Sequence, residues 1–273
     1  MIFHLPIMEK RGDSMTSNLS VLILAKNEEK NIEECIRSVS FAREVVVIDD
    51  HSTDRTAELA RGMGARVVAH AMNGDWGAQQ TFAVTQASCD WIYFLDADER
   101  VTAGLAKRIA EIVVADDRRC AYANARLSYL WEQPIRHGGW FPDYVVRLLP
   151  REGTTVEGLV HPKICHPYRE IKLPHKYCLI HYTYRDWEHY FNKMNVYSTL
   201  AAQKLHDAGK TAYFINILLH PLWAWFRMYI LRGGFMDGRI GFVLAAFHFF
   251  YTMSKYTKFY YLGKSNRHTG ALS

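Results

Sequence analysis

Two short apolar runs that stop abruptly at carboxylates constrain the fold of this chain more than any other feature. Residues 45–48 are followed by Asp49 and Asp50, and residues 91–95 are followed by Asp96 and, two positions later, Asp98. Short β-branched or aromatic runs of this kind are typical of strands buried in a parallel sheet. Because ligands of open α/β sheets bind beyond the carboxyl ends of the strands, we expect both acidic clusters at one binding edge.

Strands and helices alternate along the first 115 residues. The pattern predicts strands at 19–25, 45–48, 65–69 and 91–95, and helices at 32–39, 56–63, 74–87 and 103–115. Alternation at this spacing implies right-handed crossovers and a parallel sheet. The predicted class is therefore α/β, with a mostly parallel sheet flanked by helices.

The last half of the chain has a different pattern. It predicts short strands at 121–130, 144–149, 171–173 and 177–181, and then a helix at 186–208. Two aromatic segments follow, at 213–231 and 240–262. We expect the short strands to complete the sheet and the aromatic segments to form a C-terminal helical extension.

Composition excludes several functional classes. The 273 residues carry a net charge of +5 without the dense Lys/Arg stripe of a nucleic-acid binder. The five cysteines are odd in number, scattered and without a C-x-x-C pair, which argues against a disulfide framework or a zinc site and favours a reducing compartment. Residues 1–18 lack the apolar core of a signal peptide, so we expect a disordered extension, an alternative start at Met15 and a cytoplasmic protein.

The paired carboxylates at the second strand end are suited to a divalent cation. Asp96 and Asp98 share one face of an extended turn because alternate residues do. Mg²⁺ or Mn²⁺ is commonly held by one or two carboxylates together with phosphate oxygens, and it improves a diphosphate as a leaving group. The alternative is an ordinary solvated acidic turn. The metal site is favoured over it because a second acidic cluster follows residues 45–48, at the end of another strand.

Asp50 is suited to accept a hydrogen bond from a base N–H or a ribose hydroxyl, and Asp49 is left undecided. Two adjacent carboxylates at a strand end repel each other unless donors or cations compensate. The alternative is a helix-capping network, which Ser52 and Asp54 would serve.

Three motifs in order resemble the family 2 glycosyltransferases: Ile-Leu-Ala-Lys-Asn-Glu at 23–28, Val-Ile-Asp-Asp-His-Ser-Thr-Asp-Arg-Thr at 47–56, and Leu-Asp-Ala-Asp-Glu at 95–99. These are inverting enzymes with a nucleotide-binding GT-A fold. Within them the chain looks most like the branch of bacterial lipopolysaccharide-core β-1,4-glucosyltransferases. That closer likeness rests on residues 138–143, 147–148, 160–161, 180–182 and 234–238, and it covers the chain from about 19 to 262.

The resemblance implies a role for each matching position. Ala25, Asn27 and Glu28 match the loop that lies against the nucleotide base, and Asp50 matches the acidic residue that contacts uridine. Asp96 and Asp98 match the pair that contacts the ribose and binds the metal, Mg²⁺ or Mn²⁺. Gln79 lies where the branch has a polar patch near the diphosphate. His181 resembles the histidine that completes the metal site in some members, and a satisfied structural histidine is the alternative. Arg147 would pair either with the diphosphate or simply with a neighbouring carboxylate.

An inverting transfer needs one base to deprotonate the acceptor hydroxyl. The candidates are Asp143, Glu157 and His161, of which Asp143 ranks first because it follows a rigid turn whose Trp140 could stack on a sugar. An ordinary turn aspartate is the alternative. Many branch members carry Glu after the Val-His pair, where this chain has Pro162, so no base role transfers to that position.

The resemblance also implies a domain organisation. We expect a GT-A catalytic domain at 19–208, with a nucleotide-sugar half at 19–115 and an acceptor half at 116–208, and a membrane-associating tail at 209–273. The tail mixes Trp, Tyr, Phe and Lys, which is typical of helices lying in the lipid headgroup plane, although packing on the protein or across a dimer is the alternative.

The predicted function is metal-dependent transfer of a hexose from a UDP-sugar to a lipopolysaccharide-core or related cell-envelope glycan. The acceptor would be lipid-linked, and the enzyme would sit on the inner face of the cytoplasmic membrane. A polyprenyl-phosphate sugar transferase is a second interpretation. A non-enzymatic phospho-receiver domain is a distant third, because it leaves Asp96, Asp98 and the aromatic tail unexplained.

Overall fold

The computed structural model describes residues 16–130, 132–159, 162–183 and 187–269, so the predicted extension at 1–18 lies almost wholly outside the described residues. The chain forms two compact units. The first contains the residues up to 125 together with 144–179, and the second contains 126–143 together with the residues from 180 onward. Strands β6 (Cys120–Leu130), β8 (Asp143–Pro150) and β12 (Leu179–Tyr182) run from one unit into the other.

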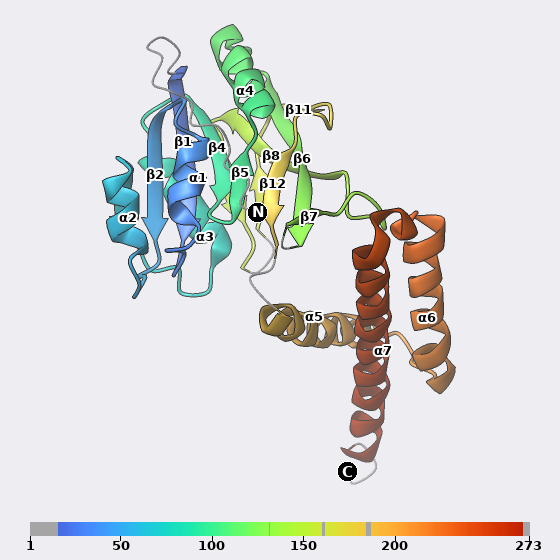
Figure 1. The fold of residues 1–273 in the computed structure, drawn as a ribbon. Helices are drawn as coiled ribbons and strands as arrows, with labels where there is room; N and C mark the ends of the chain where they lie inside the picture. Colours follow the sequence, from blue (N-terminus) through green and yellow to red (C-terminus); the bar gives the residue numbers. More distant parts are fainter. Residues whose placement is uncertain (1–15, 131, 160–161, 184–186, 270–273) are drawn as a thin grey trace. The chain divides into compact units, whose positions relative to one another are not determined.

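Four parallel strands form the first part of the sheet, as predicted (Figure 1). They are β1 (Thr16–Ala25), β2 (Ala42–Asp49), β3 (Arg66–Ala69) and β4 (Trp91–Asp96), in the order β3-β2-β1-β4. The border strand β3 is only four residues long, and its Arg66 forms an ion pair of 3.0 Å with Glu44 of β2.

The sheet continues through strands from later in the chain. The order after β4 is β8-β6-β12-β5, and β8 pairs with β4 in the antiparallel sense. β5 (Glu99–Val101), β7 (Gln133–Pro134) and β11 (Arg169–Lys172) are short; β7 and β11 both pair with β6. The predicted GT-A-like arrangement, a mostly parallel sheet flanked by helices, is confirmed.

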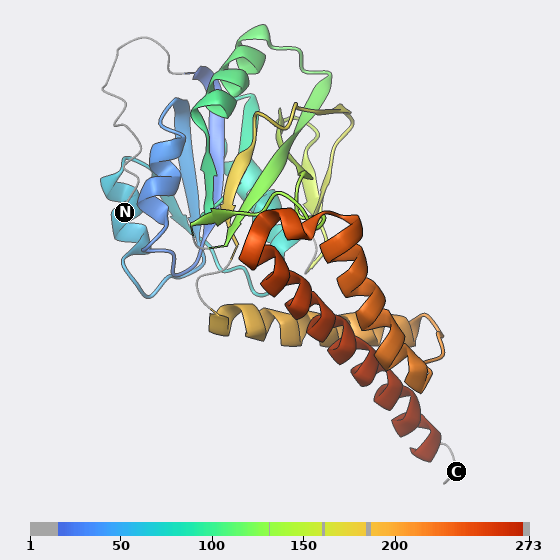
Figure 2. The ribbon, with the colours of Figure 1, turned by 45° about the vertical axis from the view of Figure 1, so that its right-hand side comes forward.

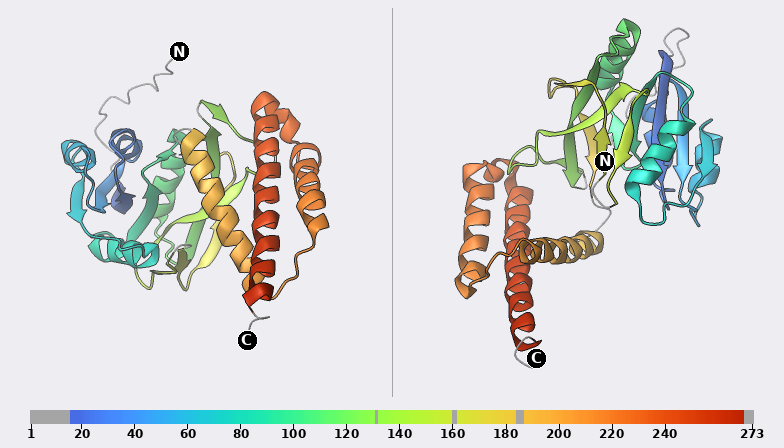
Figure 3. Two further views of the ribbon diagram at one scale, coloured as in Figure 1. Left: turned by 90° about the horizontal axis from the view of Figure 1, so that it is seen from below. Right: turned by 180° about the vertical axis from the view of Figure 1, so that it is seen from behind.

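Alternating side chains of the strands build a core on each face of the sheet. Val21 and Ile23 of β1 pack in the cluster that holds helices α1, α2 and α4, whereas Leu22 packs in the cluster that holds α3. These helices are α1 (Ile32–Ser38), α2 (Thr56–Gly62), α4 (Ala103–Ala115) and α3 (Trp76–Gln86). The right panel of Figure 3 shows α3 on the face opposite α1.

A small hairpin is attached to the start of α3. Its strands are β9 (Thr155–Glu157) and β10 (Lys163–Cys165). The amide of Gly77 donates to the carbonyl of Gly158 at 3.1 Å, and a Cβ on Gly77 would lie 2.9 Å from that oxygen. Glycine is therefore required where the helix meets the hairpin.

The second unit is dominated by long helices. They are α5 (Trp187–Asp207), α6 (Phe214–Phe226), the π-helix η1 (Arg227–Leu231), the 3₁₀ helix η2 (Gly234–Asp237) and α7 (Gly238–Thr269). Figure 2 shows α6 and α7 side by side as a hairpin. Phe214 at the start of α6 contacts the ring of Tyr260 late in α7, and Tyr229 of η1, which follows α6, contacts Phe242 early in α7, so α6 and α7 are antiparallel.

The units divide the chain differently from the expected boundary at residue 208. Helix α5 belongs with α6 and α7, because Trp187, Tyr190 and Phe191 surround Phe247 of α7 with ring centroids 5.2 Å away. Lys258 of α7 also donates to the carbonyl and side-chain oxygens of Asn195 in α5, at 2.9 and 2.7 Å. The three predicted domain ranges stay a prediction.

Within the described part of the chain, one helical segment is long and apolar enough to cross a membrane by length and composition alone. It is Phe214–Leu231, with a mean hydropathy of 1.2 and 11% of its residues buried. Pro221 lies inside α6 and is buried.

Candidate functional site

The two acidic strand ends lie at the same edge of the sheet. Ala25 at the end of β1 pairs in register with Asp49 of β2, and Leu24 pairs with Asp96 of β4. Asp50 and Asp96 therefore leave the sheet on either side of the end of β1, about 10 Å apart for two strand spacings. The sequence-based expectation of one shared edge is confirmed.

Two loops at this edge are joined by hydrogen bonds. The amides of Asn27 and Glu28 donate to Ser52 Oγ at 2.9 Å and Thr56 Oγ1 at 2.7 Å, and Thr53 donates its amide to Asn27 Oδ1 at 2.8 Å. Asn27 has a φ of +55°, a left-handed conformation that asparagine tolerates better than most residues. The polar residues after Asp50 therefore hold the loop that contains the predicted base-contacting positions.

Asp50 is the accessible member of the Asp49-Asp50 pair. Lys26 Nζ donates to its Oδ2 at 2.8 Å and the amide of Met72 donates to its Oδ1 at 3.0 Å. Desolvation acts to raise the pKa of Asp50, but these two hydrogen bonds outweigh it and hold the pKa below its usual value. Asp49 is 5% exposed and accepts from the Ser52 amide at 3.2 Å, so it serves the turn.

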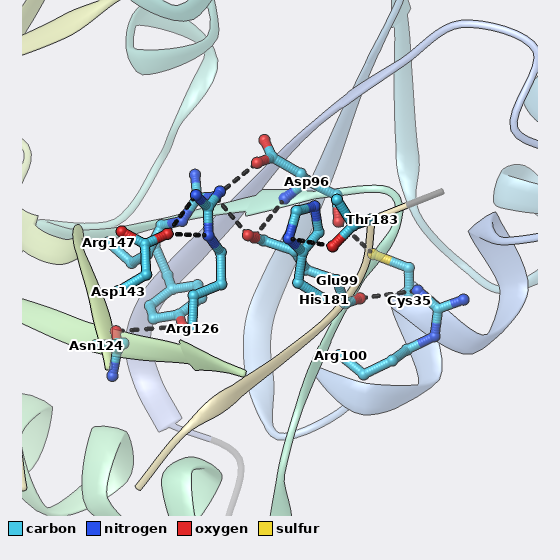
Figure 4. A network of polar contacts seen from close by, with 11 residues as sticks. Cys35, Asp96, Glu99, Arg100, Asn124, Arg126, Asp143, Arg147, His181 and Thr183 are labelled. Carbon is cyan, nitrogen blue, oxygen red and sulfur yellow. Dashed lines mark hydrogen bonds and ion pairs between the residues drawn. The ribbon is translucent and has the colours of Figure 1, made fainter. Parts of the chain in front are cut away.

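A buried arginine neutralises two carboxylates beside the second strand end (Figure 4). Arg147 Nη2 lies 2.5 Å from Asp96 Oδ2 and 2.6 Å from Glu99 Oε1, and Glu99 is fully buried. Burial would lower the pKa of Arg147, but the charges of Asp96 and Glu99 outweigh it and raise the pKa above its usual value. The structure therefore shows the pairing of Arg147 with neighbouring carboxylates, and its contact with a diphosphate stays a prediction.

The turn between Asp96 and Glu99 is held by a second arginine. Arg100 Nη1 donates to the carbonyls of Ala97 at 2.9 Å and Glu99 at 2.8 Å. The amide of Asp96 donates to Glu99 Oε2 at 3.1 Å. Asp98 is half-buried on this fixed turn.

The donor set of this turn fits a hard divalent cation, because Asp96 and Asp98 offer carboxylate oxygens. Among the described residues, no group of three or more His, Cys, Asp or Glu side chains is arranged to hold an ion. The predicted set of Asp96, Asp98 and His181 stays a prediction. His181 lies in β12, where its Nδ1 is 3.3 Å from Thr183 Oγ1.

Gln79 and Glu157 lie around the start of α3. Gln79 is 2% exposed, and its side chain contacts His70 Nδ1 at 2.6 Å and donates to the His70 carbonyl at 2.8 Å. Glu157 is exposed on the β9 hairpin that is attached to Gly77. The diphosphate role of Gln79 and the base role of Glu157 are not tested by these contacts.

Two of the other predicted acceptor residues, Trp140 and Asp143, lie in the second unit. Arg126 donates to Asp143 Oδ2 from Nε at 3.0 Å and from Nη2 at 2.6 Å (Figure 4). Trp140 is half-buried and packs against the core that contains Ile135 and Met228. His161 lies outside the described residues.

Comparison with known proteins settles the family. The model of the family described as Glycosyl transferase family 2 matches residues 20–168, more than half of the chain. The chain belongs to this family. The match leaves the phospho-receiver interpretation without support.

Relatives of this family 2 glycosyltransferase are similar to it over most of its length. An uncharacterized glycosyltransferase of Rickettsia bellii is 30% identical over 245 residues, covering 85% of this chain and 82% of that protein. The lipopolysaccharide core biosynthesis glycosyltransferase LpsC of Rhizobium meliloti is 30% identical over 239 residues, covering 83% and 86%. These relatives confirm the resemblance to the lipopolysaccharide-core branch.

One solved structure gives a weaker likeness. Glucosyl-3-phosphoglycerate synthase from Mycobacterium tuberculosis, in complex with Mn²⁺, uridine diphosphate and glucosyl-3-phosphoglycerate, aligns with 77% of this chain and 88% of its own at 17% identity. The TM-score is 0.45, which is too low to transfer any property.

Several residues of the site were not predicted from the sequence. Lys26 lies in the first motif, and Glu99 directly follows Asp98, so adjacency to the motifs was an available signal for both. Arg126 had no such signal, because its partner Asp143 is 17 residues away in the sequence, on the strand that follows the loop. Pairing of this kind is tertiary and leaves no local pattern.

Proposed function

We propose that this enzyme transfers a hexose from a UDP-sugar, with inversion, to a hydroxyl of a lipopolysaccharide-core or related cell-envelope glycan. Family membership supports the transferase reaction. The observation that carries the donor assignment is the shared edge, where Asp50 and Asp96 flank the end of β1. The lipopolysaccharide acceptor is supported by the likeness to LpsC.

Each residue of the donor edge has a chemical role in this proposal. Asp50, held ionised by Lys26, accepts from the uracil N–H or the ribose, and the loop of Asn27 and Glu28 lies along the base. Asp96 and Asp98 would hold Mg²⁺ or Mn²⁺, which would neutralise the diphosphate as it leaves. Arg147 keeps Asp96 oriented, since it fixes one carboxylate oxygen at 2.5 Å.

The acceptor hydroxyl needs a base, and Asp143 is the proposed one. The second oxygen, Oδ1, is the one that could take a proton, because both hydrogen bonds from Arg126 reach Oδ2. With 45% of its side chain exposed, Asp143 is accessible to a substrate. General base catalysis of this kind contributes roughly 10²- to 10⁴-fold to a rate.

Replacing Asp143 with Asn should lower kcat by roughly 100-fold or more, because the amide keeps the shape but cannot take the proton. The Michaelis constant for the donor should stay within about twofold of wild type. Steady-state transfer assays at saturating acceptor measure both values. Glu157→Gln is the matched control on an exposed carboxylate; if it causes the larger loss of kcat, the base is Glu157 and not Asp143.

We also propose that the hairpin of α6 and α7 lies on an anionic membrane surface. Exposed apolar side chains follow helical spacing on α6, at Ile215, Leu218, Leu219, Leu222 and Phe226, each at least 41% exposed. Residues 209–264 contain seven Lys or Arg and a single acidic residue, Asp237, which is buried. An exposed apolar face in a segment with an excess of cations matches anionic lipid headgroups.

The double variant Leu218→Glu and Leu222→Glu should weaken binding to vesicles that contain anionic lipid by roughly 100-fold, because two apolar insertions become charges. Co-sedimentation with anionic and with zwitterionic vesicles measures the partitioning. Val114→Glu is the matched control, since Val114 is 81% exposed on α4 of the first unit. Equal binding by wild type and the double variant would refute the membrane proposal.

The polyprenyl-phosphate sugar transferase remains the second candidate, since it also needs a nucleotide sugar and a membrane. The two functions differ in the product. Incubation of the enzyme with a radiolabelled UDP-sugar, with a core oligosaccharide in one tube and polyprenyl phosphate in another, identifies the acceptor. Label on the phosphate of the polyprenol would replace the proposal made above.

A further inference from the structure

A single buried carboxylate ties the C-terminal hairpin to the loop that carries Trp140 and Asp143. Asp237, at the end of η2, accepts the amides of Arg136 at 3.2 Å and His137 at 2.8 Å, and its Oδ1 lies 2.8 Å from His137 Nδ1. The side chain of Asp237 is 5% exposed. Hydrogen bonds to a buried carboxylate are about twice as strong as neutral ones.

The same two segments also touch backbone to backbone. The amide of Gly138 donates to the carbonyl of Arg232 at 2.9 Å. Gly139 has a φ of +87°, and a Cβ there would collide with the guanidinium of Arg232. Within the hairpin, a Cβ on Gly241 would collide with the Gly234 carbonyl oxygen, so η2 is pressed against α7. These contacts leave the loop little freedom relative to the hairpin.

The loop also has backbone hydrogen bonds of its own, because the amide of Ile135 donates to the carbonyl of Ser128 at 2.9 Å and the amide of Trp140 donates to that of His137 at 3.2 Å. Residues 135–142 lie outside helices and strands, and their packing against the core comes from Ile135 and Trp140. The conformation of such a segment depends on its tertiary hydrogen bonds. Asp237 accepts two of them near the start of the loop, from consecutive amides, whereas Arg126 holds Asp143 directly after the end of the loop.

We propose that Asp237 is a positioning residue for the acceptor, acting through the backbone of Arg136 and His137. This inference rests on the proposed function, in which Trp140 and Asp143 serve the acceptor and α6 lies on the membrane. Asp237 fixes the loop of residues 135–142 to the hairpin of α6 and α7. The kcat/KM for the acceptor, and not that for the donor, therefore depends on the hairpin.

Asp237→Ala should lower kcat/KM for the acceptor by roughly tenfold or more, since the loss of hydrogen bonds to a charged group lets the loop move. The thermal stabilisation of the variant by UDP with Mn²⁺ should match that of wild type. Asp207→Ala is the matched control, because Asp207 ends α5, is 63% exposed and accepts a hydrogen bond from Gln203 at the surface of the same helix. Asp237→Asn, which keeps one acceptor oxygen, should show an intermediate loss.

Hydrogen exchange at the amides of Arg136 and His137 tests the tie without any turnover, and it should be at least tenfold faster in Asp237→Ala. Faster exchange with unchanged acceptor kinetics would overturn the positioning role. Equal loss of acceptor use and of UDP stabilisation would overturn it as well, because a general loss of structure would then explain the defect. If the wild-type enzyme transfers no sugar, the proposed function is refuted. The hydrogen-exchange measurement then still shows whether Asp237 protects the amides of Arg136 and His137.

Discussion

Asp98→Ala is expected to abolish measurable transfer from a UDP-sugar, with a loss of at least roughly 1,000-fold in kcat/KM. Asp98 is half-buried on a turn that Arg100 fixes through the carbonyls of Ala97 and Glu99, so its removal leaves the turn in place. In the proposed function, Asp98 supplies carboxylate oxygens to the cation together with Asp96, one oxygen of which is held by Arg147. Loss of a cation that neutralises a leaving diphosphate costs several kcal/mol in the transition state.

Thermal shift with UDP-sugars, with and without Mn²⁺, separates this role from a loss of folding. The variant should unfold within about 2 °C of wild type without ligand, and Mn²⁺ should no longer increase the stabilisation by the nucleotide. Asp117→Ala is the control, because Asp117 pairs with Arg119 at 2.7 Å on the surface, where ion pairs contribute little. Mn²⁺-dependent stabilisation that survives in Asp98→Ala would exclude Asp98 as a metal ligand.

Arg147→Met is expected to destabilise the fold by about 3–5 kcal/mol, the usual cost of removing one partner of a buried ion pair. Glu99 is fully buried and would lose the guanidinium that lies 2.6 Å away, while Asp96 would lose its partner at 2.5 Å. For a chain of this size, the loss corresponds to a fall of roughly 10 °C in the melting temperature.

Two further variants decide whether the cost comes from the buried charge. The double variant Glu99→Gln with Arg147→Met should recover part of the melting temperature, because the uncompensated charge is gone. Arg119→Met is the control at an arginine that is 87% exposed, and its melting temperature should stay close to that of wild type because exposed ion pairs contribute little. If Arg147→Met melts like wild type, the pairing with Glu99 does not stabilise this edge.

The donor edge could be predicted because its determinants are local. Asp50 and Asp96 each directly follow a strand, and parallel strands end at one edge, so sequence order alone places them together. The pairing of Arg147 with Asp96 joins residues 51 positions apart, and the sequence offered it only as one of two alternatives for the arginine.

The second unit was less predictable, because its contacts also join residues that are far apart in the sequence. The helical pattern of residues 187–207 and 214–226 is visible in the sequence, but the aromatic contacts to Phe247 that join α5 to α7 depend on tertiary packing. Asp237 gave no signal at all beyond its place in the motif at 234–238, since its partners Arg136 and His137 lie about 100 residues earlier.

The border strand β3 has a consequence for how copies of the enzyme meet. It is four residues long and begins with Arg66, which is held by Glu44 of the neighbouring strand. A short border strand that carries a charge is a poor template for an added strand from another molecule. Pairing of β3 with a strand of another molecule is therefore disfavoured. Aggregation through this edge of the sheet should not occur even when the protein is expressed at high concentration.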